Sequence, residues 1–247
     1  MPAGMDVVAR AALLLAASHV VCAQSLEISS APPDLSGVWR PALARGRGGP
    51  AAAPLPLKSP YKERYDAFRA RQREAAGRGE QLATRGLCEP YGMPTMMQVA
   101  VYPMEVIQTA RQVTIIGEAF SEVRRIYLGK TQISPDDVDP GYYGHSVGHF
   151  EGDTLVVDTI GIKESVHGYQ DMPHSDTMRI TERIRRTAQD ALSDEITIVD
   201  PVVLDKPVTY SLHYTLAPNY EMVEFVCENN REYVDEKGVV HMKLQDK

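Results

Sequence analysis

Histidines and one glutamate are the residues of this sequence best suited to proton-transfer chemistry. Apolar residues recur at every second position over 178–184, and Glu182 shares their face. A carboxylate on the apolar face of a strand must be paired, or its pKa must rise. Imidazole takes up and releases protons near neutral pH, so histidines that meet in space can act as general acids and bases. Four histidines fall within a stretch of thirty residues: His145, His149, His167 and His174.

These groups predict an acid–base site. Glu182 and His174 are the predicted proton-transfer pair. His145 or His149 is expected to assist. A structural interpretation stands beside this one: Glu182 can form an ion pair with an inward arginine such as Arg125, and His174 can bond to the backbone of its own loop.

Arginine and aromatic side chains are the predicted substrate contacts. Arg125 and Tyr127 alternate onto one face of the segment 122–128, where they can hold a carboxylate and a phenol. Core packing and ion pairing are the alternatives for these two residues. Tyr143 and Phe150 complete the predicted set of substrate-binding residues.

The spacing of the histidines argues against a metal site. His145 and His149 are four residues apart in a segment that reads as a strand, and four strand residues rise about 13 Å. Two ligands of one metal lie much closer, because each metal–nitrogen bond is about 2 Å long. The sequence contains no H-E-x-x-H or C-x-x-C motif. We therefore predict no metal and no cofactor, with a histidine-ligated metal enzyme as an alternative.

Short alternating segments must position these residues. The first is predicted at 97–102 and the last at 220–228, with turn residues between successive segments, and Gly37 to Trp39 can open an earlier strand. This pattern predicts a mostly β fold, either an antiparallel barrel of lipocalin type or a sandwich. Ser59 and Pro60 begin one amphipathic helix. Its apolar face is expected to pack over one end of the sheet through Tyr61, Tyr65 and Phe68.

The segment order predicts an exported protein with one domain. Arg10, an apolar run and the small-residue pattern Val21-Cys22-Ala23 resemble a cleavable signal peptide. We therefore expect a periplasmic or secreted location. The predicted parts are a signal peptide at 1–23, an extended lead and flexible loop at 24–58, one barrel domain with its N-terminal helix at 59–231, and a charged tail at 232–247.

Cysteine content and charge limit the partners. Signal cleavage leaves Cys88 and Cys227, and an oxidising compartment permits a disulfide between them. Two separately buried thiols are the alternative. The formal net charge of −7 argues against a nucleic-acid partner, which requires clustered Lys and Arg. We also expect no membrane partner after cleavage. The sequence is compatible with a homo-oligomer.

One run of residues carries a family resemblance. Residues 144–159, GHSVGHFEGDTLVVDT, are similar to a G-x-S-x-G-x-W-E-G-D-T-L-V-V-D-T signature. It occurs in a large group of secreted, mostly uncharacterised bacterial proteins. The resemblance extends to the motifs around Cys88 and Cys227, which implies that these cysteines pair. Phe150 stands where the group usually has Trp, a change that can reshape a cavity.

The expected function follows from these features together. More loosely, the group is similar to periplasmic cofactor-free lyases of lignin-dimer breakdown. This implies a lyase that performs decarboxylation, elimination or isomerisation on a small aromatic or phenolic acid. A non-catalytic barrel that binds a small molecule is the alternative.

Overall fold

The structure is a computed structural model that describes residues 32–42, 54–83, 88–99, 102–164, 166, 169–227 and 232–242. All of them belong to one compact unit of the chain, Pro32–Lys247. The predicted signal peptide lies outside the described residues. Within the described residues, no helix combines the length and apolar character needed to cross a bilayer.

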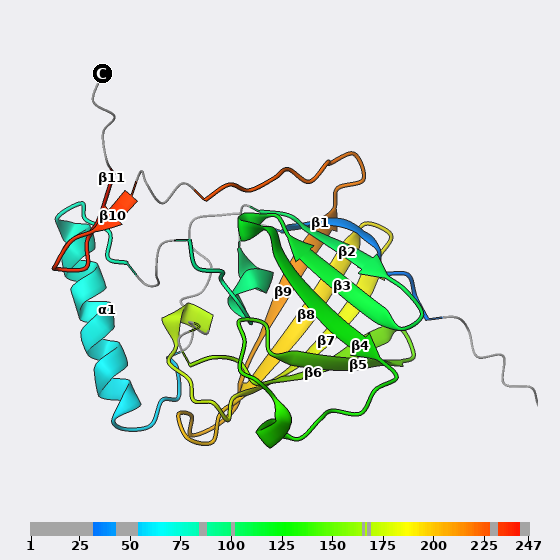
Figure 1. Ribbon diagram of the computed structural model, residues 1–247, viewed down its shortest axis with the longest axis horizontal. Coiled ribbons are helices and arrows are strands. Elements are labelled where there is room, and N and C mark those ends of the chain that lie inside the picture. The colour runs from blue at the N-terminus through cyan, green and yellow to red at the C-terminus, as the bar shows by residue number, and fades with distance from the viewer. Residues whose placement is uncertain are drawn as a thin grey trace, which may run out of the picture. The chain divides into compact units, whose positions relative to one another are not determined.

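Nine strands close into a barrel, as Figure 1 shows. Each strand pairs with the next in the chain, and β1 also pairs with β9. The predicted mostly β barrel with one helix is thereby confirmed. The strands are β1 (Gly37–Pro41), β2 (Met104–Gln108), β3 (Gln112–Gly117), β4 (Glu122–Leu128), β5 (His145–Glu151), β6 (Thr154–Ile160), β7 (Arg179–Ala188), β8 (Ala191–Val199) and β9 (Val208–Leu216).

Alternation within each strand separates the barrel interior from its outer surface. In β8, Leu192, Asp194, Ile196 and Ile198 are buried, whereas Glu195 between them is exposed. Side chains of a strand point to opposite faces in turn, so every second residue enters the interior. Buried Trp39, Ile126, Leu155 and Ile180 continue this interior on other strands.

The pair β4 and β5 is the exception to the antiparallel pattern, because these neighbours are parallel. A parallel pair needs a crossover connection, here residues 129–144, which includes the short 3-10 helix η3 (Pro135–Asp137). The Gln132 amide donates to the backbone carbonyls of His145 and Asp158, which ties the crossover to β5 and β6. A Cβ at Gly161 would lie 2.1 Å from Val138 Cγ1, so only glycine permits this close approach.

The helix α1 (Tyr61–Gly77) begins directly after Ser59 and Pro60, as predicted. Tyr61, Tyr65 and Phe68 are half-buried, while Lys62 and Glu63 are exposed. The Tyr65 hydroxyl donates to the Gln170 carbonyl at 3.0 Å, within the short 3-10 helix η4 (Tyr169–Asp171). The apolar face of the helix therefore lies toward the barrel, as its spacing predicted.

Three segments differ from the sequence expectations. β1 lies inside the predicted lead of 24–58, so the barrel begins before residue 59. Part of the predicted strand at 97–102 is instead the 3-10 helix η1 (Thr95–Gln98), because Pro94 and the tight turn before it favour helical backbone. Residues 220–227, predicted as a strand, pair with no strand in the described part of the chain. A further 3-10 helix, η2 (Ala119–Ser121), joins β3 to β4.

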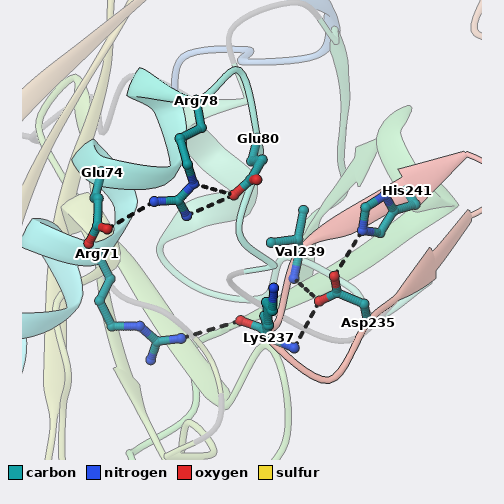
Figure 2. Close-up of polar contacts among 8 residues, drawn as sticks. All are labelled: Arg71, Glu74, Arg78, Glu80, Asp235, Lys237, Val239 and His241. Carbon is teal, nitrogen blue, oxygen red and sulfur yellow. Dashed lines mark hydrogen bonds and ion pairs between the residues drawn. The ribbon is translucent and has the colours of Figure 1, made fainter.

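The predicted charged tail contains a hairpin, β10 (Glu232–Val234) and β11 (Val240–Met242). Figure 2 shows how its turn meets the end of α1. The Asp235 carboxylate accepts hydrogen bonds from the backbone of Lys237 and Val239, each at 2.9 Å, and pairs with His241. Arg71 donates to the Lys237 carbonyl, so the hairpin is attached to the helix and is not a free tail.

Cys88 and Cys227 form a disulfide, with their Cα atoms 5.6 Å apart. The predicted pairing is confirmed. The bond joins two segments separated by 139 positions, one before β2 and one after β9. It therefore encloses eight of the nine barrel strands in one covalent loop.

We expect the double substitution C88S/C227S to lower the free energy of unfolding by about 4–5 kcal/mol, because a closed loop of this length restricts the unfolded chain. Denaturant titration of the oxidised protein and the variant measures the difference. Under reducing conditions the two curves should coincide. A variant as stable as the oxidised protein would contradict this account.

Candidate functional site: an acid pair inside the barrel

A buried arginine defines the polar centre of the barrel. Arg124 on β4 is 1% exposed and Glu182 on β7 is 0% exposed. The Arg124 Nη1 donates to Glu182 Oε1 at 2.8 Å, and Nη2 donates to Oε2. This two-bond geometry is the strongest form of arginine–carboxylate pairing. The prediction that Glu182 points into the interior is confirmed.

Two hydroxyl groups complete the coordination of the guanidinium. Arg124 Nη2 also donates to Thr159 Oγ1 at 2.9 Å and to Ser146 Oγ at 3.2 Å. The two hydroxyls lie 2.8 Å apart. Since β4, β5, β6 and β7 are neighbours in this order, each strand contributes one member to a polar row across the barrel wall.

The partner of Glu182 was predicted one residue away from its true position. Arg125 is exposed on the outer surface, because Glu122, Arg124 and Ile126 are the inward residues of β4. Arg125 and Tyr127 share a face, as predicted, and that face is the outside of the barrel. The structure therefore gives Arg125 no place in an interior substrate site.

Asp194 on β8 is a second interior carboxyl that the sequence interpretation missed. It is 0% exposed, and no hydrogen-bond donor reaches either of its carboxyl oxygens within the described residues. Burial raises the pKa of Asp194 well above its usual value, and the charge of Glu182 raises it further. Asp194 therefore lies close enough to Glu182 for the charge of that carboxylate to oppose its ionisation.

The interior therefore holds one ion pair, Arg124 with Glu182, and one further buried carboxyl group. Burial and the neighbouring Glu182 both raise the pKa of Asp194 and favour its protonated form. Two carboxyl groups whose environments separate their pKa values are the usual preparation for acid–base chemistry. Asp194 also lines a small interior cavity of about 10 Å³ with Leu35, Met97 and Tyr214, among others. A space of this size holds about one water molecule.

Tyrosines connect this acid pair to one end of the barrel. Tyr210 on β9 is half-buried. Burial raises the pKa of its hydroxyl, and the nearby carboxyl groups of Asp194 and Glu182 raise it further. Its ring stacks on Tyr169 at 4.0 Å between centroids, and its hydroxyl accepts a hydrogen bond from the Gln98 amide at 3.3 Å. Tyr169 belongs to η4, so this stack joins β9 to that short helix.

The histidines that the structure describes do not gather above Glu182, and His167 lies outside the described residues. His174 is 4% exposed, and its two ring nitrogens lie 2.9 and 2.8 Å from the carbonyl oxygens of Ser175 and Val166. Both contacts are to backbone carbonyl oxygens, which can only accept hydrogen bonds. The structural interpretation of His174, a bond to the backbone of its own loop, is the one that the geometry matches.

His145 and His149 lie on the outer face of β5, opposite to inward Ser146. His145 stacks on Tyr127 at 5.6 Å and contacts Gln132 of the crossover at 2.7 Å. The His149 side chain is 63% exposed and pairs with Glu151. His145 and Tyr127 therefore meet on the outside of the barrel, away from the interior site predicted for them.

The remaining predicted substrate residues are aromatic and half-buried. Phe150 is on the inward side of β5 and packs against the core. Tyr143 also packs against the core, and burial raises its pKa, with a further contribution from Glu122. Neither residue lines the interior cavity beside Asp194, and both pack against the core.

Comparison with protein-family models and with curated proteins found no match for this chain. Among the described residues, no group of three or more His, Cys, Asp or Glu side chains is placed to hold a metal ion. The chemistry of the site therefore has to be argued from the interior acid pair itself.

We expect R124M to lower the free energy of unfolding by about 3–5 kcal/mol, because it leaves the Glu182 carboxyl buried without its partner. The double variant R124M/E182L should recover most of that loss. R125M is the matched control on the same strand, and an exposed change there should stay within about 0.5 kcal/mol. Equal losses in R124M and R125M in denaturant titrations would show that the pair does not stabilise the fold.

We expect D194N to change how stability depends on pH. The pKa of Asp194 in the folded protein is raised above its usual value of 3.8, so its contribution to stability is full below about that pH and is lost as pH rises through the folded pKa. Asparagine cannot ionise, so the stability of D194N relative to the wild type should rise by up to about 1.4 kcal/mol per pH unit across that window. Denaturant titrations between pH 4.5 and 8 measure this difference. Parallel curves would mean that Asp194 is not protonated in the folded protein.

Proposed function

We propose that this protein is a cofactor-independent lyase that performs acid–base chemistry on a small aromatic or phenolic acid. One observation carries the proposal: Asp194, fully buried and with a raised pKa, lies beside the Glu182–Arg124 ion pair inside a barrel. A proton donor and a proton acceptor in a dry interior are what decarboxylation, elimination and isomerisation require.

In this proposal the two carboxyl groups have different roles. Asp194 delivers its proton to a substrate carbon as the carboxylate of the substrate leaves as CO2, and it regains a proton from solvent after product release. In an isomerisation, Glu182 accepts a proton from one carbon and Asp194 returns one to another. Arg124 keeps Glu182 charged and oriented, so it acts as a positioning residue.

The stacked tyrosines support an aromatic substrate. Tyr169 and Tyr210 lie with their ring planes 14° apart, which shows that this end of the barrel accommodates flat rings face to face. A substrate ring that takes the place of Tyr169 against Tyr210 would direct its acid group toward Asp194. Entry to the acid pair requires separation of this stack, because the interior cavity itself is small.

A non-catalytic barrel is the second candidate. The small size of the interior cavity favours it, since a sealed acid pair can serve the fold alone. For either candidate we propose a periplasmic or secreted location, supported by the disulfide and by the expected signal peptide.

We expect D194N to lower kcat at least about 100-fold on any phenolic acid that the wild type converts, because general acid catalysis contributes 10²–10⁴-fold. The test incubates purified protein with 4-hydroxycinnamic, 4-hydroxybenzoic and vanillic acids and follows CO2 release and loss of ultraviolet absorbance. E195Q, on the outward side of the same strand, is the matched control and should keep full activity.

Three results separate the candidates. Turnover that falls in D194N with substrate affinity retained supports the lyase. Saturable binding without any product supports the non-catalytic barrel. Full turnover in D194N contradicts the proposed role of the acid pair.

A further inference from the structure

A pocket outside the barrel has the features of a second ligand site. An open pocket of about 240 Å³ lies between α1 and the segment that leads to β7. None of Arg124, Glu182 or Asp194 lines it. Its lining residues are Arg64, Tyr65 and Phe68 from the helix, and Glu164, Val166, Asp171, Met172 and Pro173 from the segment.

Two polar contacts hold the walls of this pocket in place. The Tyr65 hydroxyl donates to the Gln170 carbonyl at 3.0 Å, and Arg69 pairs with Asp171 at 3.1 Å. Both contacts join α1 to η4. The floor is also fixed, because Met172 is buried in the core. A site whose walls are already ordered loses less free energy when it binds a ligand.

Two opposite charges of this pocket lack partners. Arg64 and Glu164 are both exposed, and among the described residues neither side chain forms an ion pair or a hydrogen bond. The third charged residue, Asp171, is already neutralised by Arg69. The pocket therefore presents one available guanidinium and one available carboxylate beside an apolar floor.

This arrangement selects the charge type of a ligand. A simple carboxylic acid would pair with Arg64 but would be repelled by Glu164. A simple amine would pair with Glu164 but would be repelled by Arg64. A ligand that carries both charges satisfies both residues. The apolar remainder of such a ligand can lie against Phe68, Met172 and Pro173.

We propose that this pocket binds a small zwitterion, an α-amino acid with an apolar side chain. Its carboxylate pairs with Arg64, and its ammonium group pairs with Glu164. The pocket is smaller than the roughly 300–1,000 Å³ of sites for drug-sized molecules, which agrees with a ligand of amino-acid size. The inference is independent of the lyase proposal, because it uses none of the interior residues.

Isothermal titration calorimetry of the full chain with L-phenylalanine tests this site. We expect saturable binding of one molecule per chain. The compounds 3-phenylpropionate and 2-phenylethylamine, which lack one charge each, should bind at least about tenfold more weakly, since each charged hydrogen-bonded contact contributes about 1.5–3 kcal/mol.

Matched variants locate the site. R64Q and E164Q should each weaken L-phenylalanine binding at least about tenfold. R73Q, an exposed arginine of the same helix outside the pocket, should bind like the wild type. Absence of saturable binding, equal affinity for 3-phenylpropionate, or equal affinity of R64Q and R73Q would each overturn the proposal. D194N should leave this binding unchanged, so failure here is distinguishable from failure of the lyase proposal.

Discussion

A guanidinium inside a closed β-barrel is the constraint on which the rest of this interior depends. A buried cation is costly unless it is paired and fully hydrogen-bonded. Glu182 supplies the opposite charge, and Ser146 and Thr159 supply further acceptors from the two strands between. With that charge balanced, a second ionised carboxyl would leave the interior with a net negative charge. The pKa of Asp194 is therefore raised, and the same charge balance that stabilises the core places a second carboxyl group beside the first.

Other buried carboxylates organise the chain segments that cover the barrel. Glu122 accepts hydrogen bonds from the backbone of Tyr91 and Gly92, close to the disulfide, and Asp200 accepts them from Ser175 and Val203. Of these residues, Tyr91 and Gly92 lie in the motif beside Cys88 on which part of the family resemblance rests. That motif therefore attaches a chain segment to the barrel.

Alternation in the sequence located the strands and the inward direction of Glu182, because its neighbours Ile180 and Ile184 are plainly apolar. The same pattern in β8 places Asp194 between Leu192 and Ile196, so the second acid was detectable and was missed. The partner arginine was harder to identify. Both faces of β4 carry a mixture of apolar and charged residues, so the sequence does not show whether Arg124 or the next residue points inward.

Contacts that depend on distant parts of the chain were outside the reach of these patterns. Three of these contacts depend on how loops return to the barrel. They are the parallel pairing of β4 and β5, the bond from the crossover segment to the His145 carbonyl, and the carbonyl partners of His174. Four histidines close in sequence suggested one shared site. The alternation of the strand instead placed His145 and His149 outside, opposite to Ser146, and a loop enclosed His174 separately.

The closing strand of the barrel has a consequence for how the chain matures. β1 lies near the start of the domain and pairs with β9, the last strand of the barrel. During synthesis the N-terminal segments emerge first, so β1 must remain without one of its neighbours until almost the whole domain is available. Until then the free edges of β1 and β8 expose backbone groups that can pair with other chains. A nascent chain of this protein therefore depends on completing its C-terminal portion before it is protected from aggregation.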